Sequence, residues 1–365
     1  MKKGWKIVPM GKLCSISSGE SDTQDAVEDG PYAFFDRSKT IKRSSRFLYD
    51  CEALIIPGEG KEFLPKHFEG KFDLHQRAYA LFDFLPELDV RFLYHLLHHR
   101  SDYFPSVAVG ATVKSLRRRH FEDLPVPVPP LAEQQRIVGL LDEAFEGLAT
   151  AKANAAKNLQ NARALFESHL QSVFTKHGAG WETRTIGDVC EVIAGQSPEG
   201  KFYNADGKGT PFYQGKKDFG DKFIEAPTSW TTQTTKLAKA GDILMSVRAP
   251  VGPVNFTTGE VCIGRGLAAI RSSAELNRDF LFYQLWHLQP KIAGREGAVF
   301  ASINKAEIKA LPLSFAPLAE QQRIVGILDS LSEDTKRLTR LYEEKLAALE
   351  ALKKSLLHRA FTGEL

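Results

Sequence analysis

The chain has 365 residues, of which 43% are hydrophobic and 25% charged, with 28 glycines, 18 prolines and a formal net charge of +3. This composition is typical of a soluble globular protein of two or three domains and excludes collagen-like and Pro/Gly-rich disordered chains. Charge interrupts every apolar run before the ~20 residues that a membrane span requires, and residues 1–6 lack the apolar continuation of a secretory signal, so a cytoplasmic protein without a membrane partner is expected.

Residues 1–129 are expected to form an α+β domain, a twisted sheet with a few helices. After an amphipathic opening that ends in a Gly/Ser turn, β-type segments and one helical pattern follow. The predicted strands are residues 32–35, 53–56 and 78–82, and the predicted helix is residues 91–99.

Residues 130–175 are predicted to form one long helix. Between Glu133 and Phe174 there is no proline and there are only two glycines, and Pro129 and Pro130 stand just before the first turn, where a missing N–H costs nothing. Glu133 adds negative charge near the positive end of the helix dipole. Apolar residues recur at alternating spacings of three and four, as in a coiled-coil seam.

Residues 176–316 are expected to form a second α+β domain, with strands at residues 211–213, 242–247, 261–263 and 267–270 and a helix at residues 279–287. A second long helix is predicted within residues 317–365, from Glu320 to about Phe361. At ~1.5 Å per residue, a helix of about 40 residues spans roughly 60 Å, more than a globular domain uses internally. Its predicted heptad seam consists of Ile324, Leu328, Leu331, Thr335, Leu338, Tyr342, Lys345, Leu349, Leu352 and Leu356.

The second half of the chain repeats the first. The segment Pro-Leu-Ala-Glu-Gln-Gln-Arg-Ile-Val-Gly-Leu-Leu-Asp at residues 130–142 recurs at residues 317–329, 187 positions later, with a single Leu-to-Ile change. No residue is inserted or deleted across the two helices, whereas the middles of the two domains share almost nothing. This pattern indicates a constant frame that carries two different surfaces, although a structural tandem without function would give the same repeat.

Each long helix needs a partner for its apolar seam, and the other helix is the obvious one. Packed antiparallel, the two helices would join the domains into one chain with a pseudo-two-fold internal repeat. Leu365 would then lie close to Met1, as in a circularly permuted chain. The open alternative is that each helix packs only on its own domain.

Basic residues cluster inside both domains, although each domain is close to neutral on average. Loops that combine Arg or Lys with Ser, Thr, Asn, Gln and aromatic side chains suit phosphate contacts and base-edge hydrogen bonds. A single cluster is more often a solvated face than a DNA site, and clusters in both halves favour DNA binding. The candidate DNA-binding residues are Arg37, Lys39, Lys42, Arg43, Arg46, Lys114, Arg117, Arg118 and Arg119 in the first domain, and Lys208, Gln214, Lys216, Lys217 and Arg248 in the second.

No catalytic constellation and no metal site are expected. The segment from Pro57 to Lys61 lacks the GxxxxGK[ST] spacing of a phosphate-binding loop and is interpreted as a turn. Four cysteines without a CxxC pair argue against a disulfide framework or a thiolate zinc site. Of His95, His98 and His99, two are adjacent and the run lies in a predicted surface helix, so they are expected to bind nothing. The sequence therefore indicates recognition without chemistry.

The motif Pro-Leu-Ala-Glu-Gln-Gln-Arg-Ile-Val, present twice at the start of a long helix and each time after a diverged domain, closely resembles that of the specificity subunit of type I restriction-modification systems. The resemblance covers essentially the whole chain and implies a non-catalytic protein. Each diverged domain would be a target-recognition domain that reads one half of a bipartite, asymmetric sequence in double-stranded DNA. The helices would fix the spacer, with the domains about one DNA turn, ~34 Å, apart.

The resemblance also implies partners. Two modification subunits would carry S-adenosylmethionine, and restriction subunits would supply ATP- and Mg-dependent translocation and cleavage, so no cofactor is expected in this chain. A two-headed, protein-binding scaffold is the alternative, and an enzyme active on its own is the third possibility. Subunit docking is expected in the helix repeat, at Glu133, Gln134, Gln135 and Arg136 and at Glu320, Gln321, Gln322 and Arg323.

Overall fold

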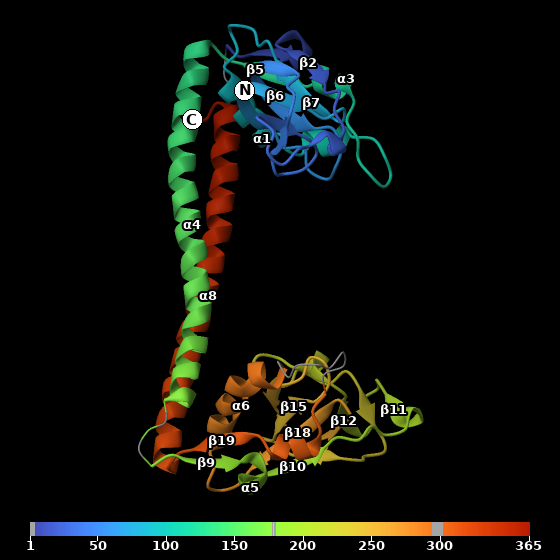
Figure 1. Ribbon diagram of the computed structural model, residues 1–365, viewed down its shortest axis with the longest axis vertical. Helices are drawn as coiled ribbons and strands as arrows, with labels where there is room; N and C mark the ends of the chain where they lie inside the picture. The colour runs from blue at the N-terminus through green and yellow to red at the C-terminus, as the bar shows by residue number, and fades with distance from the viewer. Residues whose placement is uncertain (1–3, 177, 179, 294–301) are drawn as a thin grey trace. The chain divides into compact units, whose positions relative to one another are not determined.

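Figure 1 shows a computed structural model of the protein, which describes residues 4–176, 178, 180–293 and 302–365. The chain divides into two compact units. Met1–Ala156 with Glu343–Leu365 form unit 1, and Lys157–Tyr342 form unit 2. Each unit therefore combines one globular domain with parts of both long helices, and unit 1 is built from the two ends of the chain.

The two long helices are α4 (Leu131–Thr175) and α8 (Leu318–Thr362), each of 45 residues. Both begin directly after a proline whose carbonyl accepts the first intrahelical bonds, at Pro130 and at Pro317. Their bounds confirm the two helices predicted from the repeat.

In unit 1 the helices run antiparallel. Lys152 of α4 pairs with Glu350 of α8, and Lys353 Nζ lies 5.0 Å from the centre of the Phe145 ring. Residues earlier in α4 thus meet residues later in α8, which confirms the predicted direction.

The heptad seam predicted for α8 is correct along its first part and shifts along its second. Ile324 and Thr335 are buried, whereas Lys345 and Leu352 are exposed and Leu346 is half-buried in place of Lys345. A strict seven-residue repeat drifts by about 20° per heptad on a straight helix, which moves the buried stripe onto neighbouring positions. The prediction was therefore wrong at Lys345 and Leu352.

Unit 1 contains a six-stranded mixed sheet in which β3 and β6 run parallel, and a two-stranded ribbon that leads into α4. The sheet order is β2-β7-β5-β6-β3-β4, and the ribbon pairs β1 with β8. The predicted strands and helix are confirmed, and β6 was not predicted. The elements are β1 (Lys6–Pro9), β2 (Ser15–Ser18), β3 (Tyr32–Phe35), β4 (Lys42–Ser44), β5 (Tyr49–Pro57), β6 (Lys66–Leu74), β7 (Ala78–Phe82), β8 (Pro125–Val128), α1 (Val90–His99), α2 (Tyr103–Val107) and α3 (Arg118–Glu122).

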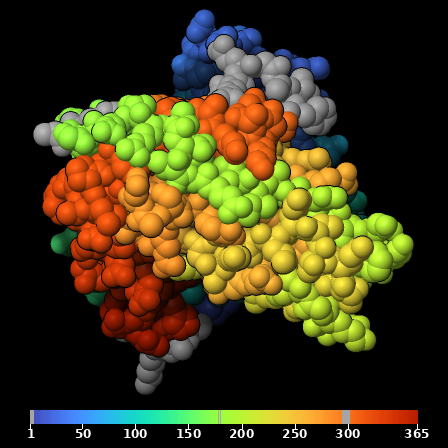
Figure 2. All heavy atoms as spheres, turned by 90° about the horizontal axis from the view of Figure 1, so that it is seen from below, coloured from blue at the N-terminus to red at the C-terminus, as the bar shows by residue number. Residues whose placement is uncertain are grey.

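Unit 2 distributes corresponding strands over two sheets, in the orders β10-β18-β15-β16 and β11-β13-β12-β17-β14, and pairs β9 with β19. Figure 2 shows the green segment of β9 beside the orange segment of β19 on one face. The elements are β9 (Glu182–Thr185), α5 (Ile186–Val189), β10 (Cys190–Ala194), β11 (Tyr203–Asn204), β12 (Thr210–Tyr213), β13 (Trp230–Thr231), β14 (Leu237–Ala238), β15 (Ile243–Ser246), β16 (Val254–Phe256), β17 (Val261–Ile263), β18 (Leu267–Ser272), α6 (Arg278–Ala293), α7 (Lys305–Lys309) and β19 (Pro312–Phe315).

The last turn of α8 completes the core of unit 1. The Phe361 ring lies 5.2 Å from Phe92 of α1 and stacks on His99 at 5.5 Å, and Trp5 packs edge-on against Phe92 at 6.4 Å. The C-terminal Leu365 packs against the same core as Trp5. The chain ends therefore meet as expected, although Met1 itself lies outside the described residues.

The last turn of α4 does the same for unit 2. Phe174 lies 5.4 Å from Phe280 of α6 and 5.7 Å from His287, and Trp181 packs on Phe280 at 5.9 Å. Each helix thus packs against both the domain before it and the domain after it, so the alternative of packing on its own domain alone is wrong.

Two fully buried glutamines fasten the helix starts to their domains. Gln134 Oε1 accepts a bond from Asp89 N (2.8 Å), and Gln134 Nε2 donates to the carbonyls of Glu87 and Pro129 (2.8 Å each). These three bonds use up most of the hydrogen-bonding capacity of a side-chain amide. The equivalent bonds of Gln321 join it to Asn277, Glu275 and Ala316.

About two turns further along each long helix, an aspartate forms a hydrogen bond with an aromatic side chain of the neighbouring domain. In unit 1 His95 Nε2 lies 3.0 Å from Asp142 Oδ1, and in unit 2 Tyr283 Oη donates to Asp329 Oδ1 at 2.5 Å. His95 is buried, so the prediction of a surface helix was wrong for this face of α1. The histidine is a packing residue at the junction between domain and helix.

The four cysteines are unpaired, and burial raises the pKa of Cys14 and of Cys190 to about 12. Within the described ranges, no three His, Cys, Asp or Glu side chains gather as a metal site would require. No helix in the described part of the chain is both long and apolar enough to cross a membrane.

Replacing Gln134 with Leu is expected to lower the free energy of unfolding by about 2–4 kcal/mol, because the Glu87 and Pro129 carbonyls and the Asp89 N–H lose the partner that the buried amide gives them. Thermal or urea unfolding measures the change. Replacing the adjacent, exposed Gln135 with Leu is the matched control and should change stability by less than about 0.5 kcal/mol. Equal effects of the two substitutions would contradict the assigned role of Gln134.

Candidate nucleic-acid interface

Both units hold the same set of main-chain bonds at one end of their sheets. In unit 1 the turn between β6 and β7 is tied to the end of β3 by a bond from His75 N to Phe35 O (2.9 Å). In unit 2 the turn between β17 and β18 is tied to the end of β12 by the bond from Gly264 N to Tyr213 O (2.8 Å). The loops that follow β3 and β12 therefore lie beside these turns.

Further straps bring two more segments to the same place. In unit 1, Gly58 N donates to Arg77 O (2.8 Å) and Leu116 N donates to Gly58 O (2.7 Å). Because these bonds join main-chain groups, they can form with any side chains on the two segments. The corresponding bonds of unit 2 run from Val247 N to Gly266 O (3.0 Å) and from Ile303 N to Val247 O (3.1 Å).

We name this region the loop end of each unit. Glu59 and Arg248 occupy the same position in it, because Glu59 forms a β-bridge with Ser115 and Arg248 forms one with Ser302. The frame is the same, yet the side chain is an anion in one unit and a cation in the other. The loop end comprises residues 36–39, 58–61, 75–77 and 109–115 in unit 1, and residues 214–217, 247–250, 264–266 and 302–303 in unit 2.

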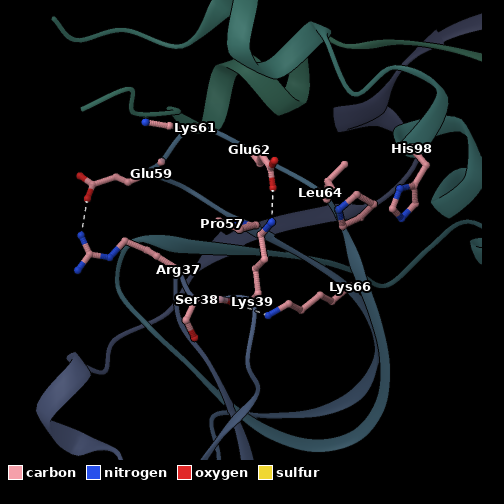
Figure 3. Close-up of a pocket in the computed structure, with 12 residues that line it drawn as sticks. Arg37, Ser38, Lys39, Pro57, Glu59, Lys61, Glu62, Leu64, Lys66 and His98 are labelled. Carbon is pink, nitrogen blue, oxygen red and sulfur yellow. Dashed lines mark hydrogen bonds and ion pairs between the residues drawn. The ribbon is translucent and has the colours of Figure 1, made fainter. Parts of the chain in front are cut away.

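Glu59 holds two arginines at the loop end of unit 1. Arg37 Nη1 lies 3.0 Å from Glu59 Oε2, as Figure 3 shows, and Arg77 pairs with Oε1, which also accepts a bond from Ser115 Oγ (3.3 Å). Although burial favours the neutral acid, the bonds from Arg77 and Arg37 hold the pKa of Glu59 below its ordinary value. Each guanidinium has five donors, so it keeps donors for another acceptor while Glu59 fixes its direction.

A pocket of about 560 Å³ opens beside Arg37 (Figure 3). Lys39 at its edge pairs with Glu62 (2.8 Å), and Lys66 donates to Ser38 O (2.7 Å). Burial lowers the pKa of His98 to about 4, so its imidazole is neutral at pH 7. The positive charge of the pocket comes from Arg37, Lys39, Lys61 and Lys66.

The remaining candidates of the first cluster are bound within their own domain. Their bonds fix the β3–β4 region, which leaves Arg37 and Lys39 as the members of this cluster at the loop end. The bonds join Lys42 to Asp36, Arg43 to the carbonyls of Gly30 and Pro31, and Arg46 to Ser21 and the buried Asp73.

The second cluster lies on the chain segment that follows α2. Lys114 belongs to the hairpin at residues 109–115, while Arg117, Arg118 and Arg119 stand at the start of α3, and all four side chains are exposed. Arg118 pairs with Glu122 (2.8 Å). Within the described part of the chain, Lys114 and Arg119 form no ion pair.

Gln214, Arg248 and Arg265 meet at the loop end of unit 2. The Gln214 carbonyl lies close to Gly266: a Cβ on Gly266 would be 2.2 Å from the Gln214 carbonyl oxygen. The Gln214 side-chain amide donates a hydrogen bond to Tyr203 Oη (3.4 Å). Arg265 is exposed at the centre of the β17–β18 turn, and Arg248 follows the strap to Gly266. The main-chain segments that carry these three residues therefore lie side by side, and all three side chains are exposed.

The other candidates of unit 2 flank this surface. Lys216 and Lys217 follow Gln214 and are exposed, and Lys217 Nζ lies 3.8 Å from Asp218. Lys208 lies in a loop closed by Asn204, whose amide bonds both the N–H and the carbonyl of Lys208.

The selection from sequence missed Lys61, Arg77 and Arg265. Lys61 ends the segment that was interpreted as a turn, and the two arginines stand singly between uncharged neighbours, so none of them forms a cluster along the chain. Aligning the strands of the two units would have identified the two arginines. Arg77 follows β6 and Arg265 follows β17, and each of these strands runs parallel to its neighbour in the equivalent position.

The residues expected to dock subunits divide into two kinds. Gln134 and Gln321 face inward and belong to the fold, so they present no surface to a partner. The other six lie on the outside of the helices, where the acidic and basic members form pairs along one helix. These pairs are Glu133 with Arg136 and Glu320 with Arg323, both at 2.7 Å, and Gln135 and Gln322 are exposed between them.

Exposed apolar side chains repeat in the same register. Leu140 is 43% exposed and its counterpart Ile327 is 41% exposed. Gly139 and Gly326, one residue before them, have open space where a Cβ would stand. Each long helix therefore carries the same exposed apolar surface near its start. The further matched pairs are Leu131 with Leu318 and Leu165 with Leu352.

Comparison with known proteins gives a consistent result. Residues 2–158 and 179–350 both match the family described as type I restriction modification DNA specificity domain. A Methanocaldococcus jannaschii protein described as the MjaX type I restriction enzyme specificity subunit is 32% identical over 298 residues, covering 76% of this chain and 69% of the relative. The EcoDI specificity subunit of Escherichia coli is 23% identical, covering 99% of this chain and 88% of the relative.

Two solved structures are similar over the whole chain. The HsdS subunit from Thermoanaerobacter tengcongensis matches with a TM-score of 0.66 at 27% identity, covering 100% of this chain and 98% of that one. A chain from a structural study of complex assembly and conformational transition of the type I R-M system matches with a TM-score of 0.80 at 28% identity, covering 100% and 99%.

Replacing Glu59 with Ala is expected to release Arg37 and Arg77 and to remove one negative charge from the loop end. Binding to duplex DNA of arbitrary sequence should strengthen a few-fold at low salt, because less negative charge opposes the phosphates. Discrimination between a target and an arbitrary duplex should fall by about tenfold, because the arginines lose their fixed direction. Fluorescence anisotropy over a salt series measures both quantities.

The control for this experiment is Glu62→Ala, which removes the same charge beside Lys39 and leaves both arginines in place. It should strengthen binding to arbitrary DNA and preserve discrimination. Unchanged discrimination in the Glu59 variant would show that the carboxylate does not orient the arginines for recognition.

Proposed function

Because the chain belongs to the type I restriction-modification DNA specificity family, we propose that each unit reads one half of a bipartite, asymmetric target in double-stranded DNA. As a member of this family, the protein is a DNA target-recognition subunit and is itself non-catalytic. Family membership does not favour the alternative of a protein-binding scaffold.

The observation that carries the proposal is the loop end, built twice on one frame with different side chains. In unit 1 Glu59 presents Arg37 and Arg77, and in unit 2 the position of Glu59 is taken by Arg248. Arginine pairs with guanine and glutamine with adenine through two hydrogen bonds each in the major groove. Two such surfaces with different donors suit two different half-targets.

Lysines and the remaining arginines would contact phosphates, which position the protein on the duplex without reading sequence. Lys39, Lys114 and the arginines at the start of α3 have this role in unit 1, and Lys208, Lys216 and Lys217 have it in unit 2. Lys42, Arg43 and Arg46 support the loops from within.

The long helices would fix the spacer and dock the modification subunits. The exposed apolar surface around Leu140 recurs around Ile327, flanked each time by a Glu–Arg pair. Two identical surfaces suit two copies of one partner, related as the sequence repeats are. S-adenosylmethionine would belong to those modification subunits, and ATP and Mg to restriction subunits that join the same complex in the cytoplasm.

Inserting a few residues into α4 near residues 151–156 is expected to change the spacer of the methylated sequence and to leave both half-targets unchanged. Each inserted residue lengthens a helix by about 1.5 Å. Methylome sequencing of a host that expresses the chain with its modification subunit gives the spacer and both halves. Substitution of the exposed Ala153 by Ser, without a change of length, is the control. An unchanged spacer would refute the helices as the determinant of distance.

Replacing either Leu140 or Ile327 with Asp is expected to reduce the modification subunits bound from two to one, and the double substitution should abolish binding. A carboxylate buried at an apolar interface costs several kcal/mol, on the order of 10²-fold or more in affinity. Native mass spectrometry of the assembled complex counts the subunits. Leu85→Asp, at a similarly exposed leucine of the unit 1 domain, should retain two copies. Retention of both copies in the double variant would place docking elsewhere.

A further inference from the structure

The hairpin at residues 109–115 projects from the loop end of unit 1, between α2 and α3 (Figure 1). Val109 and Ser115 close it with two main-chain bonds, of 2.9 Å and 2.8 Å. A third bond, from Gly60 N to Lys114 O (3.0 Å), ties it to the neighbouring turn. The hairpin is therefore fixed to the same frame that carries Glu59 and its arginines.

The tip of the hairpin has a tight main-chain path. Gly110 has a φ of +122°, and a Cβ at this position would lie 2.1 Å from the carbonyl oxygen of Val113. Only glycine allows this approach. The position of Val113 thus depends on the close contact between Gly110 and the Val113 carbonyl.

Val113 stands at this tip with 54% of its surface exposed. Its neighbours Ala111, Thr112 and Lys114 are exposed as well, so the tip is not folded back onto the domain. A β-branched side chain has few rotamers and loses little freedom when it is covered by a partner. A rigid, exposed apolar tip is a feature that folding of the domain does not require.

The surroundings of the tip are cationic. Lys114 follows it directly, Lys61 follows the turn to which the hairpin is tied, and Ser115 shares Glu59 with Arg37 and Arg77. In the described part of the chain, neither Lys61 nor Lys114 has an ion-pair partner. The charge around Val113 therefore suits a polyanion.

We propose that the hairpin is an apolar wedge through which Val113 contacts the bases of the first half-target. This inference rests on the proposed function. Lys114 and Lys61 would hold the flanking phosphates, and the valine methyl groups would meet a thymine methyl or the face of a base at a deformable step. A contact of this kind favours particular base steps without any hydrogen bond to a base edge. By the 187-residue offset of the repeat, the counterpart in unit 2 is residues 296–302, of which only Ser302 lies within the described residues.

The test uses the full chain assembled with its modification subunit and duplexes that carry the methylated sequence or a scrambled one. Val113→Ser removes both methyl groups and leaves a small polar side chain, so affinity for the target duplex should fall roughly tenfold while affinity for the scrambled duplex is retained. Val113→Leu should restore most of the affinity. Val27→Ser, at a valine with 41% exposure elsewhere in unit 1, is the matched control and should have no effect.

Two further variants separate the wedge from charge and from misfolding. Lys114→Ala should weaken binding to both duplexes equally and reduce the salt dependence by about one counterion. Gly110→Ala changes none of the exposed tip side chains, and by displacing the tip it should reproduce the loss seen with Val113→Ser. Thermal melting of the Val113 variants should match that of the wild type, because the side chain makes few internal contacts.

Equal target affinity for Val113→Ser and wild type would overturn the wedge, and so would equal losses on both duplexes. Weaker assembly with the modification subunit at unchanged DNA affinity would overturn it as well, because Val113 would then face a protein. Failure of the wild-type complex to distinguish target from scrambled DNA would instead refute the proposed function.

Discussion

The apolar core of each unit is completed from the far end of a long helix, and the rest of the structure depends on this constraint. Phe361, at the end of α8, packs on Phe92 in unit 1, and Phe174, at the end of α4, packs on Phe280 in unit 2. Burying a phenylalanine contributes about 1.5–3 kcal/mol, so neither unit reaches full stability without both helices. Because the end of each long helix packs in the unit where the other long helix begins, the two helices run antiparallel.

Main-chain hydrogen bonds allow the loop ends to differ while their shapes agree. The strap from Gly58 to Arg77 and the strap from Val247 to Gly266 bond the same peptide groups, whatever side chains stand beside them. Packing in the cores, by contrast, depends on side-chain shape and varies little at the junctions. A new surface at the loop end therefore leaves the stability of the fold nearly unchanged. This separation explains why the sequence repeat is strong in the helices and weak in the domains.

The sequence predicted what local periodicity encodes. Both long helices and the apolar strands followed from spacing, whereas β6 was missed because polar residues alternate along its first part, which is half exposed. Basic residues that are close in the sequence could be recognised as clusters, but their ion-pair partners could not. Arg46, for example, pairs with Asp73, which lies far from it along the chain. Lys61 and Arg265 were missed for the same reason, since the fold and not the sequence brings them to the loop end.

The core of unit 1 is built from two stretches of the chain that are separated by the whole of unit 2. A ribosome makes the strands of this domain before it makes unit 2, yet Leu357 and Phe361, which fill the same core, emerge only after unit 2. The other unit ends at Tyr342 and has all its parts earlier. Of the two units, the one whose strands are translated earlier is thus completed later, and its incomplete apolar surface is exposed while the other unit is made.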